Sequence, residues 1–296
     1  MLENPKLDWL FVINPVAGAE DKTVFVKRIK EKLKNAKKSY RLYFTTGHQD
    51  CEVIDLFIKK YSPQNIAVIG GDGTLLDVVT SVKNNPIPIA IIPFGSANGM
   101  SAELDIEPDQ DIRLNQIING REIKDFDLIK FDENTYSLHI SDIGLNAEVV
   151  SAYDKDEDRG MRTYLKHLLS VWSTKKEFNV KITADGETYE RTVFMVVIAN
   201  ARKYGSGMLI NPKGRPDDGK FELCLVTDVS IDGMIKAGLS SINERFVPLE
   251  SLETIHCKNA TIELEEEKIF QVDGEVVGKV TKITPEIIPS AVKLML

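Results

Sequence analysis

The first 125 residues alternate between short apolar runs and amphipathic stretches, and this alternation limits the fold more than any other feature of the sequence. The apolar runs, which are typical of buried strands, lie at residues 9–13, 40–44, 66–69 and 87–92. Apolar side chains at helical spacing occupy residues 20–36, 50–61 and 74–82. Strands and helices in alternation predict an α/β fold with a mostly parallel sheet and helices on its faces.

After about residue 125 the pattern changes to one of many strands and few helices. Strand-like segments lie at residues 135–143, 178–184, 191–199, 221–226, 254–264 and 268–273. Only residues 160–172 and 230–241 have a helical pattern. Such a sequence favours a β-rich, sandwich-like domain. We therefore expect an α/β domain over residues 1–127 and a β-rich domain over residues 128–289, with residues 290–296 returning to the first.

Composition argues against several classes of protein. A formal net charge of −8 is unlike that of a general nucleic-acid binder, so no nucleic-acid partner is expected. Cys51, Cys224 and Cys257 are too far apart in the sequence for a disulfide framework or a structural zinc site. Proteins without a disulfide framework are typical of the reducing cytoplasm. The N-terminus lacks a secretory signal, and no run of about 18 apolar residues occurs. A protein that works on a membrane from its surface is compatible with these features.

The segment Gly70-Gly71-Asp72-Gly73-Thr74 stands between a predicted strand and a predicted helix, where parallel sheets bind ligands. Glycines let the backbone approach a phosphate closely and adopt positive φ, and the N-terminus of the following helix favours anions. Asp72 would repel a phosphate unless a metal ion lies between them, and Mg²⁺ resolves this conflict. The alternative is a tight turn with Asp72 or Thr74 as a helix cap.

Two further loops follow predicted strands in the same relative position. They are Asn14-Pro15-Val16-Ala17-Gly18 and Pro93-Phe94-Gly95-Ser96-Ala97-Asn98-Gly99. A parallel sheet would place all three loops on one edge, where they would form a cleft rich in backbone donors. The chain has no GxxxxGK[ST] segment, which excludes a P-loop protein, and no GxGxxG after its first strand, which weighs against a dehydrogenase.

Taken in order, these motifs resemble those of the diacylglycerol kinase catalytic family, which includes bacterial diacylglycerol kinases, sphingosine kinases and ceramide kinase. The three loops are similar to the first three of that family. The matching segments in the second half are residues 160–165, Asn200, residues 205–208, Pro212, residues 217–219 and Asp273-Gly274-Glu275. The resemblance covers almost the whole chain. It implies a first domain like the nucleotide-binding half of phosphofructokinases and NAD kinases, followed by a β-rich domain.

The resemblance also implies an activity, that of an ATP-dependent lipid kinase. Such an enzyme transfers the γ-phosphate to the hydroxyl of a diacylglycerol- or sphingosine-like lipid at a membrane surface, so the protein would be cytoplasmic and peripherally membrane-associated. Asp72 would act with Mg²⁺ and the ATP phosphates, and Glu275 would be the general base. The nucleotide side would be lined by Asn14, Gly18, Gly70, Gly71, Gly73, Thr74, Gly95, Ser96 and Asn98.

Three more carboxylates are candidate metal ligands by resemblance. Asp217 and Asp218 match a region that holds a second Mg²⁺ in bacterial members, but Asp-Asp-Gly is also a common turn, and Arg215 opposes a cation there. Asp127 matches an aspartate that supports the metal–water network, with a strand-edge residue as the alternative. Asp273-Gly274 is also typical of a hairpin turn, which is compatible with Glu275 as a base.

One departure from the family pattern leaves the acceptor lipid open. Bacterial diacylglycerol kinases usually carry Asp directly after the asparagine of the third loop, where this chain has Gly99, and sphingosine kinases also lack that Asp. Two other functions stay open. One is an NAD kinase-like small-molecule kinase, because NAD kinases share Gly-Gly-Asp-Gly-Thr, and the other is a catalytically silent regulator that binds nucleotide or lipid. The oligomeric state is open as well, with a homodimer among the alternatives.

A basic run lies in and just after the first predicted helix. Its members are Lys27, Arg28, Lys30, Lys32, Lys34, Lys37 and Lys38. Such a run is most often a solvated helix face. Near a membrane surface it could also attract anionic lipid, at about 1 kcal/mol for each charge.

Overall fold

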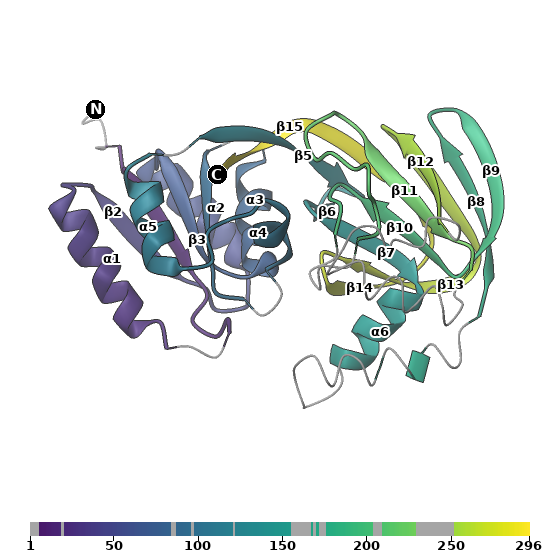
Figure 1. The fold of residues 1–296 in the computed structure, drawn as a ribbon, viewed down its shortest axis with the longest axis horizontal. Coiled ribbons are helices and arrows are strands. Elements are labelled where there is room, and N and C mark those ends of the chain that lie inside the picture. The colour runs from purple at the N-terminus through teal and green to yellow at the C-terminus, as the bar shows by residue number, and fades with distance from the viewer. Residues whose placement is uncertain are drawn as a thin grey trace. The chain divides into compact units, whose positions relative to one another are not determined.

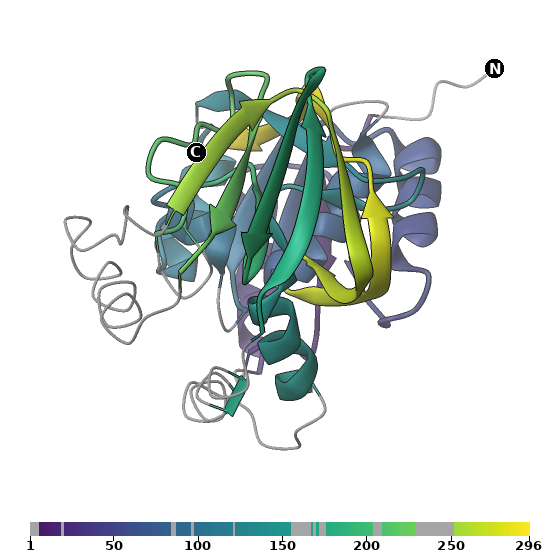
Figure 2. The same ribbon diagram turned by 90° about the vertical axis from the view of Figure 1, so that its right-hand side faces the viewer.

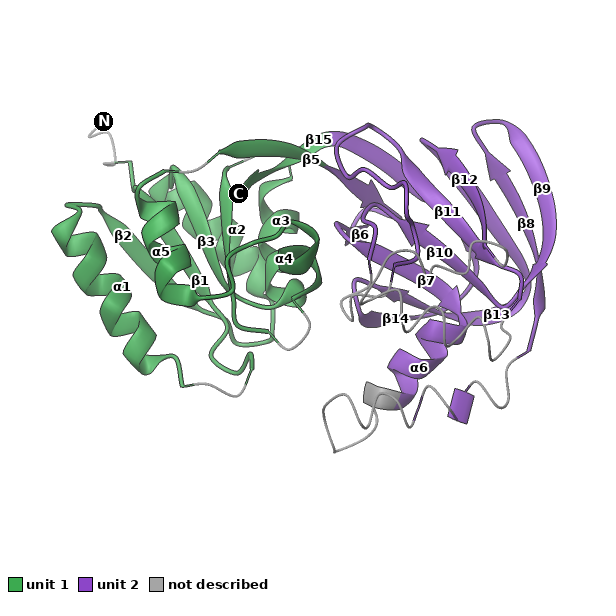
Figure 3. Ribbon diagram, in the orientation of Figure 1, with its two compact units in different colours: residues 1–126, 290–296 green, residues 127–289 purple. Residues whose placement is uncertain are grey.

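The computed structural model describes residues 6–18, 21–83, 87–95, 98–120, 122–154, 167, 170–171, 176–203, 209–228 and 252–296. The chain divides into two compact units (Figure 3), one formed by residues 1–126 and 290–296 and the other by residues 127–289. All three cysteines are free thiols. Within the ranges given above, no helix is long and apolar enough to cross a membrane.

The first unit contains a parallel sheet, as the alternating pattern predicted. Its elements are β1 (Trp9–Ile13), α1 (Thr23–Asn35), β2 (Tyr40–Phe44), α2 (Asp50–Tyr61), β3 (Asn65–Gly70), α3 (Asp72–Val82), β4 (Ile89–Pro93), α4 (Gly99–Glu103), α5 (Gln110–Ile118), the start of β5 (Ile123–Lys130) and the end of β15 (Glu286–Met295). The strand order is β2-β1-β3-β4-β15-β5. Strands β2, β1, β3, β4 and β15 are parallel, and Leu294 of β15 pairs with Ile89 of β4.

Helices cover both faces of this sheet, which explains why its central strands β1, β3 and β4 are continuous apolar runs. Side chains alternate along a strand, so Trp9, Phe11 and Ile13 of β1 share one face, where they pack with buried residues of α1 and α5. In Figure 1 these two helices lie in front of the sheet, and α2 and α3 lie behind it. Arg113 of α5 is buried and donates from Nε to the carbonyl of Ile91, 3.0 Å away, which ties α5 to β4.

The second unit is built on an antiparallel sheet, which confirms the predicted β-rich architecture. Its elements are β6 (Tyr136–Ser137), β7 (Ile140–Gly144), α6 (Leu145–Asp154), β8 (Phe178–Ala184), β9 (Glu187–Val193), β10 (Met195–Ala199), β11 (Phe221–Val226), β12 (Leu252–Cys257), β13 (Ala260–Val272) and β14 (Glu275–Ile283). The strand order is β12-β11-β10-β7-β13-β8-β9, with β14 paired to β13. Figure 2 looks onto this sheet, whose strands run from teal to yellow.

Several predicted boundaries in the second unit are wrong. Residues 191–199 form two strands that separate at Phe194, whose N–H donates to the carbonyl of Val226 while its own carbonyl accepts from Leu145. Residues 254–264 separate at Lys258 and Asn259, where the carboxylate of Asp185 accepts both backbone N–H groups. These breaks depend on partners distant in sequence, so periodicity along one segment does not reveal them.

Helix α6 is absent from the predicted elements, and β14 was implied only by the hairpin turn predicted at Asp273-Gly274. Helix α6 packs against β7 and β13 and has only a weak amphipathic pattern. Strand β14 is mostly exposed and therefore carries little apolar signal beyond its first residues. The helices predicted at residues 160–172 and 230–241 lie outside the described residues, except for positions 167, 170 and 171.

Candidate active site

The three glycine-containing loops of the first unit follow the neighbouring strands β1, β3 and β4, and the structure packs them against one another. A Cβ atom on Gly95 would lie 2.5 Å from the Cα of Gly71. A Cβ atom on Gly18 would lie 2.4 Å from the carbonyl oxygen of Phe94, and Gly18 also has a φ of 63°. These are closer than any side chain tolerates, so the glycines are required for the loops to meet.

We expect Gly95→Ala to destabilise the first unit by about 1–3 kcal/mol, the usual cost of overpacking a well-packed site. The added methyl group would also lie 2.7 Å from Oδ1 of Asn98. The φ of Gly95 is not positive, so a loss of stability would come from the close contacts of the added methyl group and not from backbone strain. Urea denaturation of the variant measures it, and an unchanged midpoint would show that the third loop can move away from Gly71 at no cost.

The segment from Gly70 to Thr74 forms a shorter loop than predicted. Gly70 ends β3, Gly71 precedes the helix, and α3 begins at Asp72 instead of Thr74. None of Gly70, Gly71 and Gly73 has a positive φ, so the expected left-handed backbone is wrong there. The glycines instead allow close approach between neighbouring groups, because a Cβ atom on Gly70 would lie only 2.6 Å from Oγ1 of Thr74.

Asp72 holds the third loop against α3. Its Oδ2 accepts the backbone N–H of Gly99 at 2.7 Å, and its Oδ1 accepts that of Met100 at 3.1 Å. These two N–H groups belong to the first turn of α4, where a helix has no partners of its own for them. The sequence suggested a cap on the helix that contains Asp72, and the structure places this carboxylate on a different helix, 27 residues further along the chain.

Two of the predicted nucleotide-side residues contact each other across the sheet edge. Nδ2 of Asn14 donates to Oγ1 of the buried Thr74 at 3.2 Å, and Oδ1 of Asn14 accepts the N–H of Val16 at 3.0 Å. The side chain of Asn14 therefore shapes its own loop and joins that loop to α3.

Asn98 closes the third loop on itself. Its Oδ1 accepts the N–H of Gly95 at 2.8 Å, its Nδ2 donates to the carbonyl of Gly95 at 2.7 Å, and its φ is 51°. Asparagine tolerates this left-handed conformation better than most residues. Ser96, which lies between them in sequence, is outside the described residues.

A lysine that the sequence reasoning missed reaches the same loops. Lys22 directly precedes α1, and only 5% of its surface is exposed. Its Nζ donates to the carbonyl of Ala17 and lies 5.2 Å from the centre of the Phe94 ring. One signal could have revealed it, because Lys22 precedes Val26 and Ile29 at the spacing of the buried helix face.

In the second unit, Asp127 and the predicted Asp217–Gly219 turn lie together. Asp127 is buried, and its Oδ2 accepts the N–H of Gly219 at 2.6 Å. Asp217 forms an ion pair with Arg215 at 3.2 Å, and Asp218 accepts the N–H of Lys220 at 3.1 Å. Across the described ranges, no three His, Cys, Asp or Glu side chains gather as a metal-binding group. A second Mg²⁺ at this turn therefore stays a prediction.

The Asp273-Gly274-Glu275 motif forms the hairpin between β13 and β14. Asp273 and Gly274 have φ values of 47° and 93°, and Val272 pairs with Glu275. Two left-handed residues in a two-residue loop are typical of a type I′ turn, so the predicted hairpin is present. Glu275 is exposed at the first position of β14.

Asp273 anchors this hairpin to the chain segment before β7. Its carboxylate accepts Oγ of Ser137 at 2.6 Å and the backbone N–H groups of Leu138, His139 and Ile140 at 2.9, 3.2 and 3.0 Å. Burial raises the pKa of Asp273, and the neighbouring His139 and Ser137 act in the opposite direction. The anchor fixes the turn from which Glu275 projects.

A second Asp-Gly-Glu sequence, at residues 185–187, makes the same kind of turn between β8 and β9. Asp185 and Gly186 have φ values of 47° and 93°, and Ala184 pairs with Glu187. Unlike Asp273, Asp185 is exposed. The local sequence therefore does not distinguish the two turns, but their surroundings do.

We expect Asp273→Asn to destabilise the second unit by about 1.5–3 kcal/mol, the usual value of hydrogen bonds to a charged group. Asparagine keeps one acceptor oxygen and turns an NH₂ group towards the remaining N–H donors. The free energy of unfolding in urea measures the effect. Asp185→Asn, at the exposed turn, is the matched control and should cost less. Equal losses in the free energy of unfolding for the two variants would mean that the greater burial of Asp273 adds nothing to stability.

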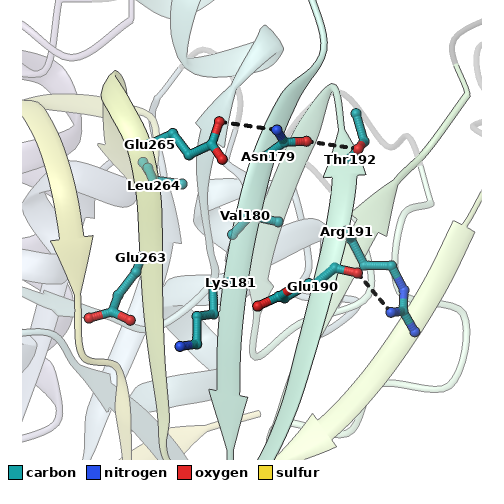
Figure 4. Close-up of a pocket in the computed structure, with 9 residues that line it drawn as sticks. All are labelled: Asn179, Val180, Lys181, Glu190, Arg191, Thr192, Glu263, Leu264 and Glu265. Carbon is teal, nitrogen blue, oxygen red and sulfur yellow. Dashed lines mark hydrogen bonds between the residues drawn. The ribbon is translucent and has the colours of Figure 1, made fainter.

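A pocket of about 480 Å³ lies on the outer face of β8, β9 and β13 (Figure 4). It is lined by Asn179, Val180, Lys181, Glu190, Arg191, Thr192, Glu263, Leu264 and Glu265. Lys181 pairs across the strands with Glu190 on one side and Glu263 on the other, an arrangement that stabilises a solvated sheet face. No predicted site residue lines this pocket, so it is not part of the candidate active site.

Comparison with known proteins matches each half of the chain to a known domain family. The sequence profile of the diacylglycerol kinase catalytic domain matches residues 8–131. That of the YegS C-terminal NAD kinase beta sandwich-like domain matches residues 140–296. A "Putative lipid kinase" of Staphylococcus carnosus (strain TM300) is 33% identical over 161 residues, which are 53% of this chain and 52% of that protein. The chain thus spans about half the length of this relative.

Solved structures show the same fold. A diacylglycerol kinase from Bacillus anthracis str. Sterne matches with a TM-score of 0.74 at 23% identity, over 97% of this chain and 96% of that chain. An NAD kinase from Archaeoglobus fulgidus in complex with ATP matches with a TM-score of 0.54 at 16% identity, over 97% and 93%. At these identities the likeness is one of fold alone. The two profiles leave only residues 1–7 and 132–139 unmatched, in agreement with the order of the motifs. The chain therefore carries a diacylglycerol kinase catalytic domain followed by a YegS C-terminal NAD kinase beta sandwich-like domain, and it belongs to the family that this second profile, which matches more than half of the chain, defines.

Proposed function

We propose that the protein is an ATP-dependent lipid kinase, which transfers the γ-phosphoryl group of ATP to a diacylglycerol- or sphingosine-like alcohol at a membrane surface. Membership of the family supports a kinase that uses ATP. The observation that carries the proposal is the packing of three loops around the start of α3, with Asp72 in the first turn of that helix.

The nucleotide phosphates would bind at this sheet edge. Gly70 and Gly71 present no side chain there, and the N-terminus of α3 offers backbone N–H groups and a partial positive charge. Mg²⁺ commonly takes one or two carboxylates together with phosphate and water oxygens, so the single carboxylate of Asp72 fits a Mg²⁺–nucleotide. When bound, the ion would neutralise the charge that develops on the phosphates.

Glu275 would accept the proton of the lipid hydroxyl. The hydroxyl oxygen would form a bond to the γ-phosphorus while the bond from that phosphorus to the leaving oxygen of ADP breaks. A general base must be held steady and reachable by its substrate. Glu275 meets both needs, because it is exposed and follows a turn that Asp273 fixes with four hydrogen bonds.

The test is incubation with γ-labelled ATP, Mg²⁺ and a total lipid extract, followed by identification of the labelled lipid. We expect one class of lipid alcohol to be phosphorylated, and no product when Mg²⁺ is omitted. Binding of Mg-ADP in a thermal-shift assay without transfer to any lipid would overturn the proposal in favour of a silent regulator.

An NAD kinase-like activity is the second candidate, because the ATP-bound NAD kinase of Archaeoglobus fulgidus shares the fold. Incubation of the protein with ATP, Mg²⁺ and NAD decides between them. We expect no NADP, since the first profile that the chain matches is that of the diacylglycerol kinase catalytic domain.

A further inference from the structure

Helix α1 carries two groups of basic side chains, which the structure separates. Arg28 and Lys32 lie on the flank that faces α5. There Arg28 pairs with Asp111 at 3.1 Å, and Lys32 contacts Asp111 at 3.6 Å and Oδ1 of Asn115 at 2.8 Å. The charge of this flank is therefore partly neutralised within the first unit, because the two cations share one carboxylate.

The other group faces solvent. Lys27, Lys30 and Lys34 are exposed, and their spacing places them on one side of the helix, away from its buried residues. Among the residues that the structure describes, none of these three lysines has an ion-pair partner. Glu31 is the only acidic residue of α1, so the solvent face keeps a net positive charge.

This face differs from the rest of the protein in charge. The whole chain has a net charge of −8, the same sign as an anionic partner. A row of cations on one straight helix would attract such a partner and orient it. In Figure 1, α1 is the leftmost helix of the first unit and lies on its outside. The face is therefore accessible in that unit.

Apolar side chains accompany the lysines. Val24, near the start of α1, is 56% exposed, and Val16, in the loop before the helix, is 83% exposed. Cationic and apolar groups together suit the boundary between lipid headgroups and acyl chains. The phosphate backbone of a nucleic acid has no apolar surface that the two valines could contact.

We propose that the solvent face of α1, defined by Lys27, Lys30 and Lys34, docks the protein on an anionic lipid surface. The choice of a lipid partner rests on the proposed function. The lysines bind the lipid phosphates, and Val16 and Val24 contact the interfacial region. Because this attraction is electrostatic and exposed, it weakens as salt concentration rises.

The experiment is sedimentation of the full chain with vesicles of phosphatidylcholine alone or mixed with phosphatidylglycerol, without ATP. We expect binding to the mixed vesicles only. The triple variant Lys27→Gln, Lys30→Gln, Lys34→Gln should bind about five-fold more weakly for each lysine, roughly a hundred-fold in total. Glutamine is nearly as good a helix former as lysine, so α1 should stay folded, which circular dichroism checks.

The matched control removes the same charge elsewhere. Lys59 and Lys282 are exposed, Lys293 is half-buried, and the three are ion-paired with Asp55, Glu263 and Asp125. Their triple change to glutamine should leave vesicle binding nearly unchanged. Equal losses in both triple variants would overturn the proposal, as would failure of the wild-type protein to bind mixed vesicles. Tighter binding of single-stranded RNA than of vesicles would overturn the choice of a lipid.

The docking surface and the kinase can fail independently. Vesicle binding needs no turnover, and phosphorylation of a lipid dispersed in neutral detergent micelles needs no anionic surface. We expect the triple variant of α1 to keep its activity on micellar lipid. Loss of that activity in a folded variant would place the three lysines in the active site and overturn their role as a docking surface.

Discussion

Asp72→Asn is expected to lower the rate of lipid phosphorylation by roughly 10²–10³-fold, the usual cost of removing one preorganised electrostatic contact to the reacting group. The variant loses the negative charge that would hold a Mg²⁺–nucleotide. It should still fold, because asparagine retains an acceptor for one of the two N–H groups of α4. Loss of the other hydrogen bond should cost about 1 kcal/mol. Steady-state kinetics with labelled ATP measures the rate, and urea denaturation measures the stability.

Asp109→Asn is the matched control for this variant. Asp109 also caps a helix, α5, where one carboxylate oxygen accepts the N–H groups of Asp111 and Ile112 at 2.9 Å each. The same chemical change at the same kind of contact should cause a similar, small loss of stability and no loss of activity. Full activity of Asp72→Asn would exclude the metal–nucleotide role. An equal loss of activity in Asp109→Asn would attribute both effects to stability.

Glu275→Gln is expected to lower the single-turnover rate by roughly 10²–10⁴-fold, the usual contribution of a general base. Glutamine has the same shape but cannot accept the proton of the lipid hydroxyl. Stability in urea should change little, because Glu275 is exposed, glutamine retains polar atoms for its contacts, and the turn before it depends on Asp273. Rapid quenching of one turnover with labelled ATP separates this effect from release of product.

Glu187→Gln is the matched control for Glu275→Gln, because Glu187 follows the second Asp-Gly turn and also begins an antiparallel strand. It should leave the rate unchanged. A loss of activity in Glu187→Gln as large as that in Glu275→Gln would contradict the assignment of the base. Full activity of Glu275→Gln would exclude it directly.

Much of the fold follows from local patterns. Strands β1, β3 and β4 of the first unit are buried on both faces and read as uninterrupted apolar runs, so their positions are predictable to within a residue or two. The second unit was harder. Residues 260–272 form one long strand that changes register between Glu263 and Lys268, and its polar middle was taken as a break between two strands. The strand pairs with β14 on both sides of this shift, at Glu263 and at Lys268, and no local pattern shows that partner.

The candidate site also contains some residues that the sequence identifies and one that it does not. The order of the motifs along the chain identified the three loops of the first unit and the Asp-Gly turn before Glu275. The buried Lys22 was missed, because a lysine beside a basic helix looks solvated until its carbonyl partner, Ala17, is known.

Residue patterns along the chain are enough to predict the α/β order of the first unit, the β-rich second unit and the family. Each of these depends on spacing along the chain, which residue types record directly. The folded chain was needed to show that Asp72 caps α4, that Gly71 and Gly95 are in contact, and that Asp273 accepts four hydrogen bonds while Asp185 is exposed. Those differences arise from contacts between segments that are distant in the chain. The carboxylate of Asp273 accepts one hydroxyl and three backbone N–H groups, whereas that of Asp185, in an identical local sequence, accepts two backbone N–H groups at an exposed position.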